Sequence, residues 1–307
     1  MSLIYMGTPD FAVEPLKALK KAGFNILLVV TQPDRKKGRG KKLSPPPVKE
    51  TAIELGLPFY QPDKIKTPEA VAKLKALNPD FIIVAAYGQI LSKEILQIPE
   101  KAPINIHASI LPKYRGASPV QHTILNMDKK TGITTMFMDE GLDTGDILHI
   151  SEVVTDKNET AESLHKKLSL MGAENIVFTL KNFHKITRKP QDNEQATYAP
   201  LLKKNDGALN WASASAKIHA KIRALNPWPG AFTIYNGQKL KIFDIETTEI
   251  KSEKNPGTVV KAAGSELVIA TDDYDIKIKR LQAPGKKQMD VSAFLNGFKI
   301  EQGAAFT

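Results

Sequence analysis

The sequence of 307 residues contains no cysteine. It can therefore form no disulfide bond and no metal site with thiolate ligands, and we expect the chain to work in a reducing compartment, the cytoplasm. Long apolar runs are also missing, since no stretch approaches the ~20 apolar residues that a membrane-spanning helix needs. The first residues, MSLIYMGTPDF, lack a charged segment followed by a long apolar one, so we expect no signal peptide.

Several motifs that would announce a cofactor are absent as well. Neither GxGxxG nor a Walker A sequence occurs, which argues against a nucleotide held by a glycine-rich loop. The six histidines show no HxxxH or other metal-binding spacing, and the acidic loop DEGLDTGD fails the EF-hand pattern. The sequence therefore predicts no metal site.

Acidic residues are outnumbered, with 33 Asp and Glu against 43 Lys and Arg, a net charge of +10 and a pI of about 9.4. Such an excess favours an acidic partner, most often nucleic acid, although lysines spread over a solvated surface give the same total. The segment QPDRKKGRGKKLSPPPVK, residues 32–49, concentrates basic residues beside two glycines. We interpret it as a mobile cationic loop that could hold a phosphate backbone, while a plain solvated loop is the alternative.

Strands and helices alternate through residue 127. Apolar runs that begin at residues 2, 25, 81 and 104 are separated by segments with helical spacing at 14–23, 44–57, 68–80 and 118–128. This alternation predicts a doubly wound α/β domain with a mostly parallel sheet. Two more strands, at 131–138 and 146–154, and a long amphipathic helix at 159–183 follow.

The texture changes in the last third of the chain. Residues 189–207 are polar and irregular, and we interpret them as a linker. A helix at 213–225 precedes five short strands with alternating polar and apolar residues, which predict a small antiparallel barrel of the oligonucleotide-binding type. We therefore expect a catalytic domain at 1–188, a linker at 189–207 and a barrel domain at 208–307.

The stretch INIHASILPKYRG, residues 104–116, places polar groups in an apolar strand. Side chains in a strand alternate between faces, so Asn105 and His107 share one face, and Pro112 then ends the pairing. Either residue alone could be a satisfied core group. Both together, at the carboxyl end of a parallel strand, predict a ligand-binding crevice. A carboxylate from DEGLDTGD, residues 139–146, could orient the imidazole there, or that loop could be only a solvated turn.

Longer motifs carry a resemblance to a known family. NIHASILPKYRGASPVQ and GLDTGDI resemble the 10-formyltetrahydrofolate-dependent formyltransferases, and MGTPDFA, TQPDRKKGRGKKLSPPPVK, YAPLLKKNDG and LNPWPGA narrow the resemblance to the methionyl-tRNA formyltransferase branch. The resemblance implies a Rossmann-like domain followed by a barrel domain that contacts tRNA. It also implies transfer of a formyl group from 10-formyltetrahydrofolate to the α-amino group of methionyl-initiator tRNA, with no membrane and no obligate protein partner.

The resemblance assigns roles residue by residue. It implies an oxyanion stabilised by Asn105 and His107, with Asp143 supporting His107. The implied folate-binding residues are Tyr87, Gly88, Gln89, Ile90, Leu91, Ser109, Ile110, Leu111, Pro112, Asp139, Gly141 and Leu142. The implied tRNA-binding residues are Arg35, Arg39, Lys41, Lys42, Lys203 and Lys204.

Other functions use the same three catalytic residues. Formyltransferases acting on a ribonucleotide lack the barrel domain, whereas those acting on nucleotide sugars and hydrolases that release formate are expected to carry a second catalytic domain, for which these 307 residues leave no room. A basic RNA-binding module without catalytic activity is the alternative of another class. The presence of Asn105, His107 and Asp143 argues against it.

Overall fold

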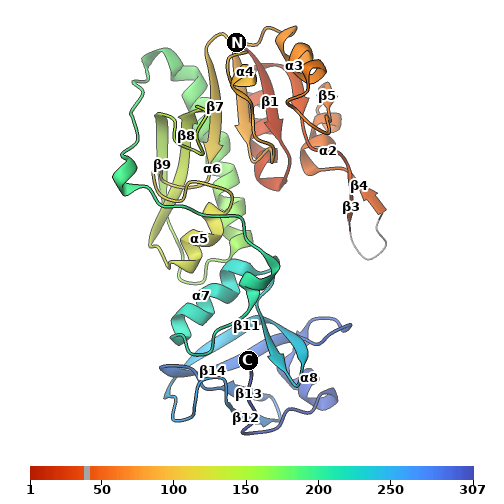
Figure 1. The fold of residues 1–307 in the computed structure, drawn as a ribbon, viewed down its shortest axis with the longest axis vertical. Coiled ribbons are helices and arrows are strands. Elements are labelled where there is room, and N and C mark those ends of the chain that lie inside the picture. Colours follow the sequence, from red (N-terminus) through yellow and green to blue (C-terminus); the bar gives the residue numbers. More distant parts are fainter. Residues whose placement is uncertain (38–41) are drawn as a thin grey trace. The chain divides into compact units, whose positions relative to one another are not determined.

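The computed structural model describes residues 1–37 and 42–307, with backbone only at Lys37 and Lys42. It divides into two compact units (Figure 1), and we describe each by itself. The first unit comprises Met1–Pro119, Lys130–Val154 and His165–Ala199, and the second comprises Val120–Lys129, Thr155–Leu164 and Pro200–Thr307. The domain boundaries expected from the sequence stay a prediction. No helix in the described ranges is long and apolar enough to span a membrane.

The first unit is built on a seven-stranded sheet with the order β5-β2-β1-β6-β7-β8-β9. The strands are β1 (Ser2–Gly7), β2 (Asn25–Val30), β5 (Phe59–Tyr60), β6 (Phe81–Ala85), β7 (Ala102–His107), β8 (Lys130–Phe137) and β9 (Ile147–Val154). The pairs from β5 to β7 are parallel, and β8 and β9 are antiparallel to their neighbours. This sheet confirms the predicted doubly wound, mostly parallel α/β fold.

Helices connect the parallel strands. They are α1 (Val13–Lys21), α2 (Pro47–Glu54) and α3 (Pro68–Lys75), which the sequence predicts, and the short α4 (Lys93–Leu96), which the sequence analysis missed. The long α6 (Ala161–Asn182), also predicted, follows β9. Prolines at the first helical position begin α2 and α3, where a missing N–H costs nothing. At α3 the Thr67 side chain also accepts a hydrogen bond from the backbone N–H of Ala70.

Helix α6 covers one face of β7 and β8. Gly172 lets the helix come close, because a Cβ there would lie 3.1 Å from Cγ2 of Ile106. Polar groups of α6 bond to the sheet as well: Asn175 donates to the carbonyl of Ile133, and the hydroxyls of Thr179 and Thr135 lie 2.7 Å apart. Since Ile106 faces α6, strand alternation turns Asn105 and His107 to the opposite face.

The basic segment is more regular than the sequence suggested. Its two ends pair as antiparallel strands, β3 (Arg35–Lys37) and β4 (Lys42–Ser44), where we expected a loop throughout. Antiparallel pairing needs only a short chain reversal, so two three-residue strands can form while side chains such as Lys36 stay in solvent. Lys49 is not part of a free cationic surface, because its ammonium pairs with Asp34 at 2.8 Å.

The second unit holds an antiparallel sheet with the order β10-β11-β14-β13-β12, to which β15 adds beside β14. Its strands are β10 (Phe232–Tyr235), β11 (Gln238–Lys251), β12 (Val259–Ala263), β13 (Glu266–Ile269), β14 (Tyr274–Gln282) and β15 (Met289–Asp290). Its helices include α5 (Pro119–Leu125), most of which lies in this unit, α7 (Ser215–Leu225) and α8 (Val291–Gly297). The sequence analysis missed β15 and α8.

The segment 303–307 joins the two edge strands of this sheet. On one side Ile234 of β10 exchanges two backbone hydrogen bonds with Thr307, with N···O distances of 2.6 and 3.0 Å. On the other side Val259 of β12 donates to Ala304, and Phe306 donates to Gly257. A sheet whose edges are joined in this way has no strand edge left open there, and the small antiparallel barrel predicted from the sequence is confirmed.

Candidate active site

Strand β7 carries two polar side chains into the interior of the first unit. All six of its residues are buried, and Asn105 and His107 are exposed by only 9% and 5%. Strands of a parallel sheet that are covered on both faces are normally apolar throughout. An amide and an imidazole at that depth therefore need polar partners, and one carboxylate lies beside both.

The carboxylate is that of Asp143, in the loop between β8 and β9. Nδ2 of Asn105 donates to Oδ1 of Asp143 at 3.3 Å, and Nδ1 of His107 lies 3.6 Å from Oδ2. Oδ2 also accepts a hydrogen bond of 2.8 Å from the backbone N–H of Gly116. The prediction that Asn105 and His107 share a face is confirmed, and the structure brings all three expected catalytic residues together.

The imidazole of His107 is held from its other side. Nε2 lies 2.9 Å from the backbone carbonyl of Tyr114, and a carbonyl can only accept, so Nε2 carries the hydrogen. Nδ1 then faces the carboxylate of Asp143 at a distance too long for a hydrogen bond. The carbonyl thus fixes the ring, and Nδ1 is the nitrogen that remains for chemistry.

The first group of expected folate residues follows β6. Tyr87 and Leu91 are buried in an apolar cluster, and burial raises the pKa of the Tyr87 phenol above its usual range. The side chain of Gln89 is used within the fold, because it accepts from the N–H of Ile65 and lies near two carbonyls of the preceding loop. Ile90 is 92% exposed and Gly88 is also exposed, so these two, with the backbone, are what this segment offers to a ligand.

The second group follows β7 and is mostly fixed by its own hydrogen bonds. The hydroxyl of Ser109 donates to the carbonyl of Lys113, and the carbonyl of Ser109 accepts from Thr134. Leu111 is buried, whereas Ile110 and Pro112 are half-buried. These bonds give the segment after β7 a defined backbone, and its role in folate binding stays a prediction.

The third group lies in the 139–142 loop and reaches the first group. Lys93 at the start of α4 forms an ion pair of 2.8 Å with Glu140, which brings this loop beside the segment after β6. Leu142 is 61% exposed. Oδ1 of Asp139 accepts hydrogen bonds from the N–H of Gly141 and the hydroxyl of Thr144. Two exposed apolar side chains, Ile90 and Leu142, thus belong to segments that lie side by side at the exposed Lys93–Glu140 pair.

The sequence analysis missed one segment that packs against the catalytic residues. Residues 189–199, part of the expected linker, pack along the loops that carry Asp143 and Tyr114. Lys189 pairs with Ile147, and Ala199 exchanges backbone hydrogen bonds with Arg115 and Ser118. Between them, the side chain of Gln191 donates to the backbone carbonyls of Asp143 and Gly145. The segment is polar and has no periodicity, so its sequence predicts a linker. Hydrogen bonds to distant backbone leave no local pattern that would predict otherwise.

The expected tRNA-binding residues are only partly described. Arg39 and Lys41 lie outside the described residues, and the side chain of Lys42 is not described either. Arg35 is exposed at the start of β3, with one nitrogen 3.3 Å from Oε1 of Gln32. Lys203 and Lys204 are exposed in the second unit. Their contacts with nucleic acid stay a prediction.

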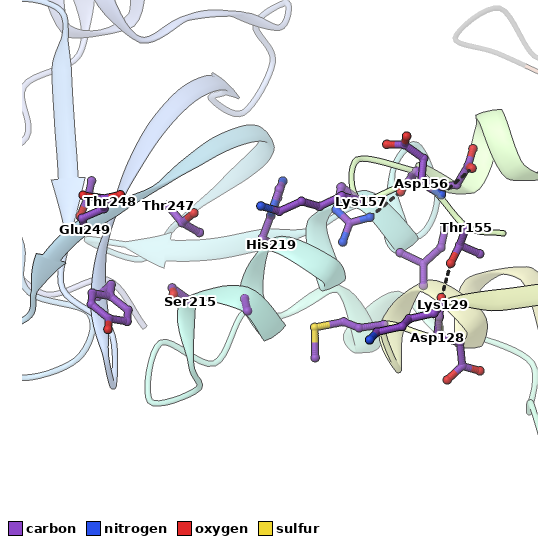
Figure 2. Close-up of a pocket in the computed structure, with 16 residues that line it drawn as sticks. Asp128, Lys129, Thr155, Asp156, Lys157, Ser215, His219, Thr247, Thr248 and Glu249 are labelled. Carbon is purple, nitrogen blue, oxygen red and sulfur yellow. Dashed lines mark hydrogen bonds between the residues drawn. The ribbon is translucent and has the colours of Figure 1, made fainter.

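A cavity is described elsewhere. It has a volume of about 840 Å³ and lies within the second unit, lined by residues that include Lys129, Lys157, Ser215, His219 and Glu249 (Figure 2). Its lining mixes acidic, basic and hydroxyl groups. The described residues contain no group of three His, Asp or Glu placed to hold a metal ion. The arrangement at Asn105, His107 and Asp143 is therefore the better candidate for catalysis.

Comparison with known proteins identifies the family of the chain. Residues 1–180 match the family model described as formyl transferase, and residues 201–299 match the model of the formyl transferase C-terminal domain. The chain belongs to the formyl transferases.

Relatives narrow the family further. The chain is 48% identical over 98% of its length to the methionyl-tRNA formyltransferase of Thermodesulfovibrio yellowstonii, covering 97% of that protein, and 45% identical to that of Clostridioides difficile, with 99% of each chain covered. It therefore falls within the methionyl-tRNA formyltransferase family.

A solved structure shares the fold at a greater distance. This is the N-formyltransferase of Helicobacter canadensis in complex with folinic acid and dTDP-3-aminofucose, with a TM-score of 0.68 and 20% identity over 92% of this chain and 98% of that one. The present chain covers 98% of that structure, which therefore holds no second catalytic domain. The expectation that formyltransferases acting on nucleotide sugars carry one is wrong for the Helicobacter structure. Sequence identity, not length, separates the two.

Proposed function

We propose that this enzyme transfers the formyl group of 10-formyltetrahydrofolate to the α-amino group of methionyl-initiator tRNA at Asn105, His107 and Asp143. The observation that supports the proposal is the convergence of an amide, an imidazole and a carboxylate from two separate elements within 3.3 to 3.6 Å. These are the groups that transfer of an acyl group to an amine needs.

The amine nitrogen attacks the formyl carbon, a C–N bond forms, and the carbonyl oxygen becomes negatively charged. Asn105 has two amide hydrogens, of which Asp143 takes one. The second can donate to the oxyanion. One such donor is worth roughly 2.7–4 kcal/mol of transition-state stabilisation.

His107 and Asp143 are placed to stabilise the oxyanion and to move the proton of the attacking amine. The attacking amine loses one proton, and N10 of the folate gains one when its bond to the formyl carbon breaks. With Nε2 fixed by the carbonyl of Tyr114, Nδ1 of His107 is the ring position that can add a charged donor at the oxyanion. The carboxylate of Asp143, 3.6 Å from that nitrogen, can accept the proton of the amine and pass it to N10 of the folate as the bond to the formyl carbon breaks.

The substrates are placed as the resemblance implies. The pterin end of the folate would meet the backbone of 87–91, the segment 109–112 and the 139–142 loop, between the exposed side chains of Ile90 and Leu142. The tRNA would meet the basic segment around Arg35 and, in the second unit, Lys203 and Lys204. No metal takes part in this scheme.

An assay of formyl transfer tests the proposal. The protein is incubated with 10-formyltetrahydrofolate and with charged initiator tRNA, uncharged tRNA, a dTDP-amino sugar or a small amine. We expect formylmethionyl-tRNA from the charged tRNA and transfer to the other acceptors slower by several orders of magnitude. Faster transfer to the amino sugar, or release of formate without an acceptor, would overturn the proposal.

A further inference from the structure

Asp143 stands in an uncommon backbone conformation. Its φ angle is 54°, in the left-handed region that costs a residue with a side chain about 1 kcal/mol or more. Gly145, two residues on, has no room for a side chain, since a Cβ there would lie 1.8 Å from the carbonyl oxygen of Phe137. The surroundings must hold this loop in place.

Gln191 holds it by both peptide groups. Its Nε2 donates to the carbonyl of Asp143 at 2.8 Å and to the carbonyl of Gly145 at 2.7 Å. Its Oε1 accepts from Nε and a terminal nitrogen of Arg115, at 3.1 and 2.9 Å. Carbonyls only accept and a guanidinium only donates, so the amide has one possible orientation and every hydrogen bond is satisfied.

Arg115 is an unusual anchor. It is 2% exposed, and among the described residues its side-chain partners are Gln191 and Asn193, both neutral. A buried cation without a carboxylate partner is costly. Its peptide neighbour Gly116 bonds directly to Oδ2 of Asp143. Arg115 thus reaches Asp143 along two routes, one through Gln191 and one through its own backbone.

We propose that Gln191, anchored by the buried Arg115, is a positioning residue that sets the orientation of the Asp143 carboxylate for formyl transfer. The inference rests on the proposed catalytic role of Asp143. Gln191 touches no reacting atom in this scheme and acts by fixing the peptide groups of residues 143 to 145. Misplacing a catalytic group by about 1 Å costs on the order of 100-fold in rate.

Two substitutions separate positioning from general stability. Q191A removes every hydrogen bond of the amide, whereas Q191E keeps acceptors for Arg115 but turns an oxygen towards the carbonyls of Asp143 and Gly145. We expect kcat to fall ~10- to 100-fold in both, with each KM within about threefold of the unsubstituted protein. Q191E should also keep the thermal midpoint, because a carboxylate beside Arg115 forms an ion pair. Q195A is the matched control, since Gln195 is exposed in the same segment and its side chain, among the described residues, bonds to Asp192 alone.

A double-variant cycle identifies the route. If Gln191 acts through Asp143, then Q191A adds little to the loss already caused by D143A. A kcat of Q191E within twofold of that of Q195A, or losses that multiply in the double variant, would overturn the inference. A D143A variant with normal kcat would instead overturn the proposed function, so the two failures are distinguishable.

Discussion

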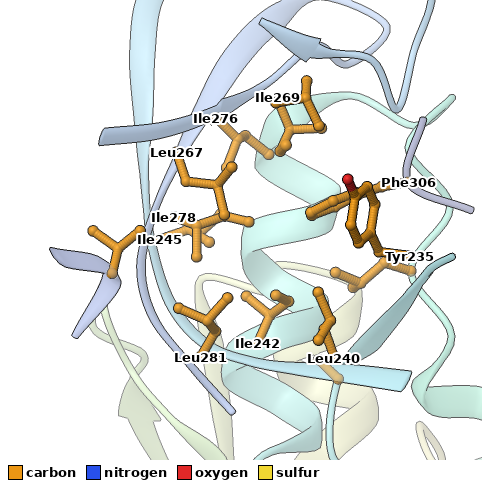
Figure 3. Close-up of a cluster of buried hydrophobic side chains, with 14 of the residues drawn as sticks. Tyr235, Leu240, Ile242, Ile245, Leu267, Ile269, Ile276, Ile278, Leu281 and Phe306 are labelled. Atoms are coloured by element: carbon orange, nitrogen blue, oxygen red, sulfur yellow. The ribbon is translucent and has the colours of Figure 1, made fainter. Parts of the chain in front are cut away.

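Strands β7 and β14 treat polar residues in opposite ways. All six residues of β7 are buried, including Asn105 and His107. In β14, buried apolar residues such as Ile276 and Ile278 alternate with partly exposed ones such as Lys277. Figure 3 shows the apolar side chains of this barrel gathered on its inside. One strand belongs to a sheet covered on both faces, and the other to a barrel with one face in solvent.

The contrast shows where precise chemistry can be built. A polar side chain of β7 must be paired by the protein, and each pairing fixes a distance and an angle. A lysine on the outside of the barrel is solvated whatever its neighbours do, so it can serve binding without defined geometry. We therefore expect substitutions of the buried polar groups at β7 and Asp143 to change the rate of formyl transfer, and substitutions inside the barrel to change stability.

The largest effect is expected from Asp143→Asn. An amide that keeps the hydrogen bond from Gly116 turns its own N–H groups towards Nδ2 of Asn105, also a donor, and it can no longer accept the proton of the amine. We expect kcat to fall by ~10³-fold or more with the fold intact. Single-turnover formyl transfer measures this, with circular dichroism as the check on folding. A loss below tenfold would leave Asp143 a structural role only.

Asn105→Ala comes next. Loss of one donor at the oxyanion is expected to lower kcat by ~10²- to 10³-fold while folate affinity stays nearly unchanged. Steady-state kinetics with fluorescence titration of the folate separates the two quantities. Normal turnover at saturating substrates would remove Asn105 from the mechanism.

Within the barrel, Ile278→Ala should act on stability. Ile278 is fully buried in the apolar cluster, so truncation is expected to cost roughly 2–5 kcal/mol of unfolding free energy. Urea denaturation measures it. Under conditions where the variant stays folded, transfer to a small amine should proceed at the normal rate, and a selective loss of that reaction would blur the contrast between the two units.

A smaller effect is expected from neutralising Arg39, Lys41 and Lys42 together, of which the first two lie outside the described residues. Each phosphate contact lowers log K by about 0.7–0.9 per decade of salt. The triple variant should bind tRNA more weakly and with a flatter salt dependence, with unchanged folate affinity. Lys20 and Lys21 are the control. They are exposed at the end of α1, which leads to the amino end of β2, whereas the basic segment follows the carboxyl end of that strand. Equal salt slopes for both variants would mean a solvated segment without contacts.

The smallest effect concerns Asp80, a carboxyl of the first unit far from the site in sequence. Lys101 at 2.7 Å and the N–H of Ser2 at 2.7 Å lower the pKa of Asp80 to about 2. A lowered pKa stabilises the fold above the unfolded value of about 4, and the contribution is lost as the pH falls towards 2. Because the pair is partly exposed, Asp80→Asn should cost below ~1 kcal/mol at pH 7. Unfolding at pH 7 and pH 3 should show the difference shrinking, and a difference that grows at pH 3 would contradict the assignment.

Strand periodicity alone predicted that Asn105 and His107 share a face, because period 2 is a local property. Asp143 was assigned by family resemblance, since the sequence left open which carboxylate of the acidic loop approaches the imidazole. Neither strand periodicity nor family resemblance pointed to Gln191 and Arg115, because a side chain that bonds groups far away in the sequence leaves no spacing pattern. The closure of the barrel by residues 303–307 was also missed, because five residues that bond backbone far away in the sequence show no strand periodicity of their own.

The separation in sequence between the groups of the site also has a kinetic consequence. Asp143 lies 38 residues from Asn105 and 48 from Gln191, and Arg115 lies 76 from Gln191. Closing such loops costs conformational entropy before any contact repays it, so we expect these hydrogen bonds to form after the strand pairs and helices around them. Substitutions at Gln191 should then speed unfolding more than they slow folding, which leaves the folding arm of a chevron plot almost unmoved.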